Sequence, residues 1–437
     1  MRGTFGKSAG RLLLTAVMAI ILCSLVATLA AAGGQGENKG KGPVTIEYSV
    51  WAQPYELEME KKYLEVFATK YPNIKVNLTT APFDAHHEKL QVRVAGANAP
   101  DVFVLSELAI TAFISKGVLK DLTPLFSRDK VPVDSFIDAA ISYCTSNGEP
   151  HAIRHREGTY YGLPTWNSPC TISYNMDMFK AAGVAYDENW DWEGYASTLK
   201  KLTKDTNGDG RIDQYGGPLF SGLGGAIPWA FIYPNGGTWV NEDATKSVVD
   251  SPATVEAYQY LVDLALTQKV TPAVAELPGL TYTQQFTTGK TATIWSHPWG
   301  LEAFKDSPFA WDVGLPPVRN GKRAVEFETC SIVMSKDTKN AEAAWTLIKF
   351  LGMDQDCLKI MTDYGVLPST KNATITSPKM KKFQRAMEFG AAPDFIAQYG
   401  EMDSIISSEL EAALLEQKSV KDALAAAKQK IDPLLAK

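Results

Sequence analysis

The strongest constraint on the fold is a regular alternation of strands and helices that starts near residue 44. Alternating apolar residues predict strands over 44–51 and 74–78, and a short apolar run over 101–105 predicts a strand buried on both faces. Helical spacing predicts helices over 54–71 and 86–97 between them. Strands separated by helices form a mostly parallel sheet with right-handed crossovers. The sequence therefore predicts an α/β fold.

Two residues with binding chemistry follow strands of this predicted sheet. Trp51 ends the first strand, and Ser106-Glu107 follows the third. Ligands of open α/β sheets bind beyond the carboxyl ends of the strands. We therefore expect Trp51 and Glu107 at the same edge of the sheet. Nothing in Leu105-Ser106-Glu107-Leu108 indicates burial, so the Glu107 carboxylate is expected to stay ionised and to accept hydrogen bonds.

The stretch from Gly158 to Phe179 marks a turn from one part of the chain to another. It holds two β-prone pieces, 159–163 and 171–174, with Pro164-Thr165-Trp166-Asn167-Ser168-Pro169 between them. A segment bounded by two prolines is not expected in a helix or in a central ladder. One interpretation is a crossing strand at the floor of a cleft between two domains. The alternative is an ordinary strand–loop–strand.

The N-terminus has the features of an export signal. Three basic residues within the first eleven precede an apolar run over 12–29, and Ala30-Ala31-Ala32-Gly33 follows as a cleavage pattern. A membrane anchor is the alternative, because the run is long enough for one. Cys23 follows Ile21-Leu22 rather than a small residue, so no lipid attachment is expected. We predict a cleaved signal peptide over 1–32, a flexible leader over 33–43, and a periplasmic or other extracytoplasmic location.

Charge and cysteine content narrow the class of protein further. The net charge is −6, and removal of residues 1–32 takes away three positive charges and no acids, which brings it to −9. This balance gives no support for binding to nucleic acid or to an anionic membrane. The exported chain keeps four cysteines, which allow three complete pairings, and the sequence does not choose among them. They are Cys144, Cys170, Cys330 and Cys357.

The polar segment over 205–213 matches the first nine positions of a calcium loop. Asp205, Asn207 and Asp209 supply side-chain oxygens at positions one, three and five, Gly210 permits the sharp turn, and Asp213 stands at position nine. The twelfth position is a glycine rather than the usual bidentate carboxylate. The alternative is a plain polar turn. A calcium ion bound here would be structural, and no other cofactor is expected.

Tryptophan is the residue type that points to a ligand. Five tryptophans end predicted strands or stand beside proline and glycine, where a ring can face a cleft: Trp51, Trp166, Trp229, Trp295 and Trp299. The flat apolar faces of sugars stack on such rings, while carboxylates and amides bind the hydroxyl groups. The pattern favours a carbohydrate site.

No catalytic signature is present in the sequence. It lacks a nucleophile elbow, a phosphate-binding glycine loop and a zinc-binding helix motif. An exported glycoside hydrolase would need two carboxyl groups, and Glu107 and Glu328 are the best candidates. A receptor for peptides or polyamines is a further alternative, since aromatic rings also suit amines.

Several short segments, each weak alone, occur in a specific order along the chain. They are Ala95-Gly96-Ala97-Asn98-Ala99-Pro100-Asp101-Val102, Gly162-Leu163-Pro164 with Tyr174-Asn175-Met176-Asp177-Met178-Phe179, Asn235-Gly236-Gly237, Ser251-Pro252-Ala253-Thr254-Val255-Glu256-Ala257, Phe286-Thr287-Thr288-Gly289-Lys290-Thr291-Ala292, and Ala343-Ala344-Trp345 with Gly365-Val366-Leu367-Pro368. With these segments nearly all of the mature chain resembles the extracellular solute-binding proteins of family 1. These are the carbohydrate receptors of ABC importers, which include maltose-binding protein.

The resemblance implies a two-lobed periplasmic-binding-protein fold of type II. Each lobe would hold a mostly parallel sheet flanked by helices, and crossing hinge segments near 163–167 and 328–332 would join the lobes. The implied boundaries are 44–163 plus 332–375 for lobe 1, and 164–331 plus 376–437 for lobe 2.

The resemblance also implies a function and a set of contacts. The protein would be a monomeric, non-enzymatic receptor that captures a mono- or oligosaccharide between its lobes and delivers it to a membrane permease. Pro169-Cys170 and the bulky Trp166 depart from the small residues that relatives often have near the hinge. The predicted ligand-contacting residues are Trp51, Glu107, Trp166, Asn167, Trp229, Asn235, Trp295, Trp299 and Glu328.

Overall fold

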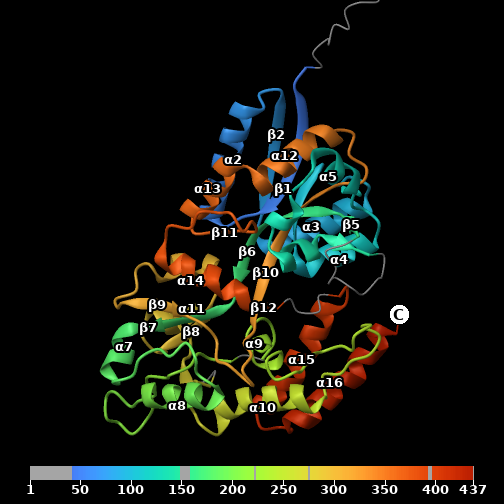
Figure 1. Ribbon diagram of the computed structural model, residues 1–437. Helices are drawn as coiled ribbons and strands as arrows, with labels where there is room; N and C mark the ends of the chain where they lie inside the picture. Colours follow the sequence, from blue (N-terminus) through green and yellow to red (C-terminus); the bar gives the residue numbers. More distant parts are fainter. Residues whose placement is uncertain (1–41, 148–157, 221–222, 274–275, 392–395, 437) are drawn as a thin grey trace, which may run out of the picture. The chain divides into compact units, whose positions relative to one another are not determined.

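The computed structural model describes residues 42–147, 158–220, 223–273, 276–391 and 396–436 (Figure 1). The chain divides into two compact units, one ending at Val44 and the other running from Thr45 to Lys437. Apart from Val44, every residue of the described helices and strands belongs to the second unit. The predicted signal peptide and nearly all of the predicted leader lie outside the described residues.

A seven-stranded sheet forms the larger of the sheets in this unit. Its strands follow the order β11-β6-β10-β3-β1-β2, and β12 pairs with β10. The strand bounds are β1 Val44–Trp51, β2 Ile74–Ala81, β3 Val102–Ser106, β6 Gly162–Pro169, β10 Val325–Met334, β11 Leu367–Pro368 and β12 Gly390–Ala391. The order mixes early and late parts of the chain, so this sheet joins segments more than 200 residues apart.

The sheet is mixed rather than mostly parallel. Strands β1 and β3 pair in parallel, as the strand–helix alternation predicts. Strand β10 pairs antiparallel with both β3 and β6, because the chain returns to the sheet from the opposite end. The predicted α/β class is confirmed. The prediction of a mostly parallel sheet in each lobe is wrong, because β11 also pairs antiparallel with β6 and both strand pairs of the three-stranded sheet are antiparallel.

Strand β6 corrects a second expectation. It contains Pro164 and Pro169 and yet lies between β10 and β11, inside the sheet. The pairing with β10 shifts register between Thr329 and Ser331, and Pro164 lies opposite Ser331. Pro169 ends the strand. Proline is tolerated at bulges and strand ends because no regular ladder bond is lost there.

A smaller sheet follows directly after β6. Its central strand is β7 (Thr171–Asn175), which pairs antiparallel with β8 (Thr293–Ser296) and with β9 (Trp311–Gly314). Only Cys170 separates β6 from β7, so one extended segment serves both sheets. A two-stranded pair, β4 (Thr145–Ser146) with β5 (Thr159–Tyr160), completes the described strands.

Helices pack around both sheets, and the predicted helices over 54–71 and 86–97 are confirmed by α2 and α3. The helix bounds are α2 Pro54–Lys70, α3 Phe83–Ala95, α4 Glu107–Ser115, α5 Thr123–Asp129, α6 Asp138–Tyr143, α7 Met176–Ala181, α8 Trp192–Leu202, α9 Trp229–Ile232, α10 Pro252–Leu266, α11 Tyr282–Thr287, α12 Ala341–Met353, α13 Gln355–Asp363, α14 Pro378–Ala386, α15 Tyr399–Leu414 and α16 Val420–Leu435. The 3₁₀ helices given bounds in the described part of the chain are η1 Val133–Ser135, η3 Pro298–Phe304 and η4 Met387–Phe389. Prolines at the first turn of α2, α10 and α14 suit these starts, since that turn has no N–H partner to lose.

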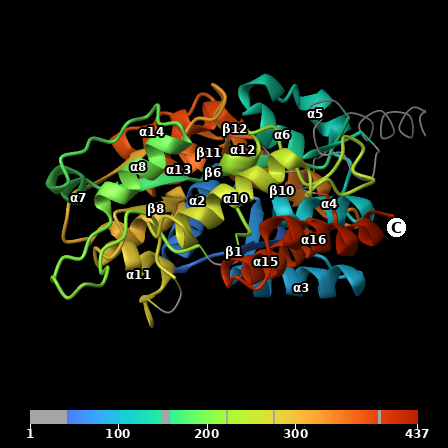
Figure 2. The ribbon, with the colours of Figure 1, turned by 90° about the horizontal axis from the view of Figure 1, so that it is seen from below.

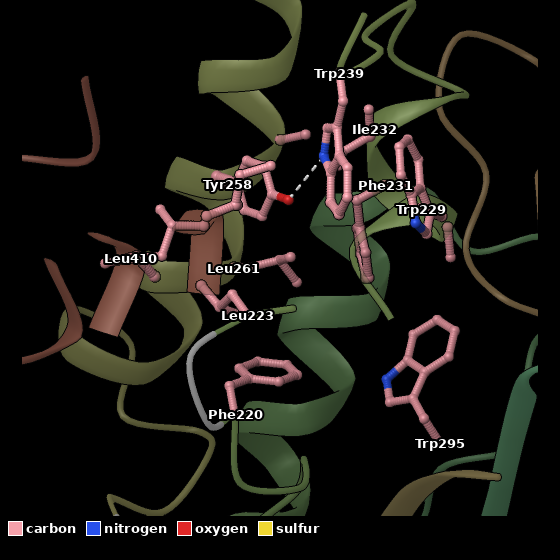
Figure 3. Close-up of a cluster of buried hydrophobic side chains, with 14 of the residues drawn as sticks. Phe220, Leu223, Trp229, Phe231, Ile232, Trp239, Tyr258, Leu261, Trp295 and Leu410 are labelled. Atoms are coloured by element: carbon pink, nitrogen blue, oxygen red, sulfur yellow. Dashed lines mark hydrogen bonds between the residues drawn. The ribbon is translucent and has the colours of Figure 1, made fainter. Parts of the chain in front are cut away.

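The largest described core cluster is rich in aromatic rings. Helices α10, α15 and α16 pack against one another beside it (Figure 2). In this core Trp239 donates its indole N–H to the hydroxyl oxygen of Tyr258, 3.1 Å away (Figure 3). A second, smaller cluster packs Phe103 and Leu105 of β3 against Ile110 and Phe113 of α4. The start of α4 is thereby fixed against the end of β3.

Within the described residues, four cysteines are buried and free: Cys144, Cys170, Cys330 and Cys357. The Sγ atom of Cys144 lies 3.1 Å from Oγ of Ser331. Burial raises the pKa of the Cys144 thiol to about 12. None of the three pairings left open by the sequence is formed. In the described part of the chain, no helix has both the length and the apolar character that crossing a membrane requires.

Candidate functional site

A cavity of about 340 Å³ lies where several elements of the large sheet end. It is bounded by the residues that follow β1, by the starts of α3 and α4, by β6 and β10, and by η3. Its lining residues are Trp51, Gln53, Glu56, Phe83, Ser106, Glu107, Leu108, Trp166, Trp299, Glu328 and Cys330. Five of the nine predicted contact residues therefore lie together: Trp51, Glu107, Trp166, Trp299 and Glu328.

A smaller hollow of about 30 Å³ shares Trp51, Glu56, Trp166 and Trp299 with this cavity. Asn167 and Glu60 also line it. Together the two hollows form what we call the tryptophan cavity.

Three tryptophans present their rings to the tryptophan cavity from different elements. The rings of Trp51 and Trp166 meet edge to face, with centroids 6.2 Å apart at 74°. Trp299, in η3, is 49% exposed and stacks on His297 with centroids 5.2 Å apart. Its indole N–H donates to Oε2 of Glu328 at 3.0 Å. This bond holds the ring of Trp299 beside a carboxylate.

Glu107 is buried, contrary to the expectation from its local sequence. Helix α4 begins at Glu107 immediately after five buried residues of β3, and only 5% of Glu107 is exposed. Its Oε2 accepts a hydrogen bond from the backbone N–H of Thr329 at 3.2 Å. Burial, and then the charge of Glu328, raise the pKa of Glu107 to about 8. The expectation of an ionised Glu107 is therefore wrong for the unliganded protein at neutral pH.

The reason for this error is a long-range strand pairing. Strand β10 lies against β3, with Cys330 opposite Ser106. The pairing covers the first turn of α4 with residues more than 200 positions away in the chain. No four-residue window around Glu107 carries that information.

A third carboxyl group was missed by the sequence analysis. Glu326 is 4% exposed, and its Oε2 has no hydrogen-bond partner in the structure. Burial, then the charges of Glu328 and Glu107, raise its pKa well above the ordinary value. The available signal was the spacing of Glu326 and Glu328, because residues two apart in a strand lie on one face. Glu56 and Glu60 of α2 were missed as well.

Three predicted contact residues, Trp229, Trp295 and Asn235, lie outside the tryptophan cavity. Trp229 is fully buried, donates its indole N–H to the hydroxyl oxygen of Tyr399 at 3.1 Å, and packs on Trp239 with centroids 4.4 Å apart (Figure 3). Trp295 of β8 is 4% exposed and packs 5.7 Å from the ring of Phe231. Neither ring lines the tryptophan cavity, because neighbouring aromatic side chains cover both.

The two predicted asparagines differ from each other. Asn235 donates to the carbonyl of Ala253 at 2.8 Å and accepts from Nε of Arg319 at 3.2 Å, away from the cavity. Asn167 lines the smaller hollow, and its Oδ1 accepts from Ser369 Oγ at 2.9 Å. The Nδ2 of Asn167 is buried without a hydrogen-bond partner in the structure.

The calcium-like loop satisfies its carboxylates internally. Asp205 accepts from the backbone N–H groups of Gly208 and Gly210, each at 2.7 Å. Asp213 accepts from the N–H and hydroxyl of Thr206, and these hydrogen bonds lower its pKa. No group of three or more His, Cys, Asp or Glu side chains suited to a metal ion occurs among the residues the structure describes. Calcium at this loop stays a prediction.

A larger cavity, of about 490 Å³, lies between α6 and the segment from β11 to η4. No tryptophan lines it, and of its charged lining residues Asp138, Lys371 and Glu388 the first two already form an ion pair at 2.8 Å. The tryptophan cavity combines uncovered rings with carboxyl groups, so it is the stronger candidate despite its smaller volume.

Comparisons with known proteins identify the family of the chain. The model of the family described as bacterial extracellular solute-binding protein matches residues 45–355. A putative binding protein of Brucella abortus is 24% identical over 431 residues, which cover 94% of this chain and 96% of that protein. An arabinooligosaccharide-binding protein of Bacillus subtilis is 24% identical over 371 residues, 80% of this chain and 79% of that protein. The structure is similar to an ABC substrate-binding protein from Listeria monocytogenes in complex with cycloalternan, with a TM-score of 0.78 and 27% identity over 90% of this chain and 99% of that chain.

Proposed function

Since the chain belongs to the family of bacterial extracellular solute-binding proteins, we propose that it is the oligosaccharide receptor of an ABC importer. The observation that carries this proposal is the tryptophan cavity, in which Trp51, Trp166 and Trp299 surround the carboxyl groups of Glu107 and Glu328. Oligosaccharide binding is named for the relative from Bacillus subtilis, and the cavity here has the chemistry for the same class of ligand.

Each part of the cavity has a defined task in this proposal. The rings of Trp51, Trp166 and Trp299 stack on the apolar faces of sugar units. Glu328 accepts hydrogen bonds from sugar hydroxyls, and a protonated Glu107 donates one. A cavity of about 340 Å³ suits one or two sugar units, at the lower end of the size range of ligand pockets.

Capture is proposed to close the cavity between two lobes with the boundaries 44–163 plus 332–375 and 164–331 plus 376–437. The separation into a large and a small sheet supports a division into two lobes, and β6 and β10 cross the proposed boundaries as strands of the large sheet. The hydroxyl of Tyr55 on α2 lies 3.5 Å from the carbonyl oxygen of Trp299 on η3, so the two sides already approach each other. A ligand that contacts both sides favours the closed state by its differential affinity.

The closed state would deliver the ligand to a membrane permease, and the protein itself would perform no chemistry. We further propose that it is exported through a cleaved signal peptide over 1–32, without a lipid anchor, and acts as a monomer. Mass spectrometry of protein purified from the exporting cell tests cleavage. A mature N-terminus near Gly33 is expected, and a diacylglycerol on Cys23 would contradict it.

A thermal-shift screen of the mature protein tests the ligand class. The panel holds arabino-, malto- and galacto-oligosaccharides, with spermidine and short peptides as competing classes. A ligand that binds only the folded state raises Tm by mass action. We expect a rise with a carbohydrate alone. A rise with spermidine or peptides, and none with any carbohydrate, would replace the proposal by the corresponding receptor class.

One observation favours glycoside hydrolysis as a second candidate. The raised pKa of Glu107 beside Glu328 is what a general acid in a hydrolase needs. Incubation of micromolar protein with the tightest-binding oligosaccharide for a day separates the two functions. We expect full recovery of intact sugar. Turnover that disappears in Glu107→Gln would establish an enzyme in place of a receptor.

A further inference from the structure

The charged side chains that line the tryptophan cavity are all acidic. Glu56, Glu107 and Glu328 line the larger part, and Glu56 and Glu60 line the smaller hollow. Among the described lining residues of both parts there is neither lysine nor arginine. Carboxyl groups that share a confined space without a cation repel one another when ionised. No described lining side chain therefore carries a permanent positive charge beside these carboxyl groups.

Two lysines of α2 contact groups outside the cavity, and two histidines of α3 are neutral. Lys61 pairs with Glu58 at 2.8 Å, and Lys62 lies over the ring of Tyr364. Burial lowers the pKa of His86 to about 4 and also lowers the pKa of His87, so both imidazoles are neutral at pH 7.

His297 is the remaining basic group next to the cavity. Its Nδ1 lies 3.0 Å from the carbonyl oxygen of Ser168 and 3.7 Å from Oε2 of Glu328. The shorter contact goes to a carbonyl, which needs a donor at Nδ1, and the distance to the carboxylate is too long for a direct hydrogen bond. The groups that face Glu107 from the elements packed on it are Glu326, Glu328 and Cys330 of β10 and Tyr143 of α6. None of these groups carries a positive charge.

Two buried polar atoms at the smaller hollow also await a partner. Oε2 of Glu60 and Nδ2 of Asn167 have no hydrogen-bond partner in the structure, although both residues are more than nine-tenths buried. Burying a polar atom without a partner is costly, and such atoms are rare unless a ligand or water completes them. Both residues line the smaller hollow, so a molecule bound there would lie next to these polar groups.

The tryptophan rings favour the same kind of ligand as the acids. The face of an indole ring attracts a cation, more strongly than the face of any other side chain does. The rings and the carboxyl groups therefore both favour a positively charged sugar over a neutral sugar that offers only hydroxyl groups.

We propose that the natural oligosaccharide carries a positive charge, in the form of an amino-sugar unit with a free ammonium group seated between Glu328, Glu107 and the tryptophan rings. This inference rests on the proposed function and names the ligand class more narrowly. The ammonium supplies the missing charge, and the remaining sugar units stack on the exposed face of Trp299. Binding of the cation stabilises the ionised form of Glu107, so Glu107 releases its proton as the ligand enters.

Three trisaccharides with one β-1,4 backbone test the charge directly: the glucosamine trimer, the N-acetylglucosamine trimer and cellotriose. Titration calorimetry at pH 6.5 measures each affinity. The glucosamine trimer is expected to bind at least about tenfold more tightly than either neutral trimer. The preference should disappear in Glu328→Gln and persist in Glu58→Gln, a matched change at an exposed glutamate outside the cavity. A preference that survives Glu328→Gln would overturn the proposal.

The same titrations in two buffers of different ionisation enthalpy count protons. Binding of the glucosamine trimer should release about one proton more from wild-type protein than from Glu107→Gln, because protons taken up by the ligand's amino groups are common to both proteins. Neutral trimers should release none in either protein.

The oligosaccharides of the thermal-shift screen distinguish failure of the charged-ligand proposal from failure of the receptor function. If neutral malto- or arabino-oligosaccharides bind as tightly as the glucosamine trimer or more so, the charge proposal is wrong and the receptor function stands. If no carbohydrate of either panel binds, both are wrong.

Discussion

Two buried glutamates of this protein have nearly the same exposure and opposite electrostatics. Glu107 in the tryptophan cavity is 5% exposed, and Glu409 on α15 is 6% exposed. Glu409 forms ion pairs with Lys418 and with Lys430, the latter at 2.6 Å, and their hydrogen bonds lower its pKa. Burial and the neighbouring Glu328 raise the pKa of Glu107 instead. Burial alone therefore does not set the charge of a carboxyl group; its partners do.

The presence or absence of a cationic partner also distinguishes a structural glutamate, Glu409, from a candidate binding glutamate, Glu107. Glu409 is balanced by lysines of its own chain, so it contributes to stability without any ligand. Glu107 is left without a cation, so the folded state carries an unfavourable interaction that a ligand can relieve. Perturbed carboxyl groups in cavities are accordingly better markers of sites than buried carboxyl groups in general.

The largest expected effect is on the pH dependence of stability through Glu107. Its pKa in the folded state, about 8, lies above the ordinary value of 4.5, so folding favours the protonated form. That contribution is complete below about pH 4.5 and is lost as the pH rises towards 8. One pKa unit corresponds to about 1.4 kcal/mol, which sets an upper bound near ~5 kcal/mol, and relaxation of the site should reduce it to roughly 2–4 kcal/mol.

Denaturant unfolding of wild-type protein and Glu107→Gln at pH 5 and pH 8 measures this effect. The variant should be the more stable protein at pH 8, and its advantage should shrink towards pH 5. Glu58→Gln serves as the control and should follow wild type at both values. Parallel pH profiles for wild type and Glu107→Gln would remove the contrast with Glu409.

The second effect concerns the two kinds of tryptophan. Trp299→Ala removes a half-exposed ring from the cavity and should weaken carbohydrate binding by roughly 1–3 kcal/mol, with little change in Tm. Trp229→Phe is the matched core variant. It should lower Tm because it leaves a cavity in a packed cluster, and it should leave the dissociation constant unchanged well below Tm. Fluorescence titration with the carbohydrate found in the screen measures both affinities, and an unaltered affinity in Trp299→Ala would exclude its ring from the site.

The third effect lies at the balanced glutamate. Glu409→Gln removes two ion pairs whose lysines can rehydrate, so we expect a loss of about 1–2 kcal/mol at pH 7. Because the folded-state pKa of Glu409 is lowered, its contribution is present above the ordinary pKa and is lost as the pH falls below it. The stability difference between wild type and variant in thermal unfolding should therefore shrink as the pH falls below the ordinary pKa of 4.5. A variant more stable than wild type at pH 7 would show that Glu409, like Glu107, is an unfavourable charge.

Local sequence patterns correctly predicted strands and helices whose formation depends mainly on hydrophobic periodicity. Alternation predicted β1 and β2, and an apolar run predicted β3. The same rules placed Trp51 and Glu107 at one edge of the sheet, and the structure brings both to one cavity. Strand ends define such an edge whatever the rest of the chain does.

The sequence did not predict the features of the site that depend on pairing between distant strands. Strand β10 pairs with β3, and in the resulting sheet both Glu107 and Glu326 are buried. The few residues on either side of each glutamate do not predict this burial. Trp229 and Trp299 both stand beside a proline, yet Pro228 leads into a helix whose residues are all buried, whereas Pro298 begins the exposed η3. Which of two similar tryptophans faces a ligand depends on tertiary contacts that the local sequence does not encode.

A third kind of carboxylate, exposed to solvent, occurs in the loop over 205–213, and the smallest effect is expected there. Asp205 and Asp209 accept hydrogen bonds from backbone N–H groups of their own turn rather than from lysines. If calcium binds there, the missing carboxylate at position twelve predicts weak, millimolar affinity. We expect 10 mM calcium to raise Tm by roughly 1–3 °C without altering the number of carbohydrate sites. In Asp209→Ala that rise should disappear, while Asp243→Ala, in another exposed turn, should keep it. Equal melting temperatures of wild type in calcium and in chelator would identify the segment as a plain polar turn, in which hydrogen bonds within the turn alone satisfy the carboxylates.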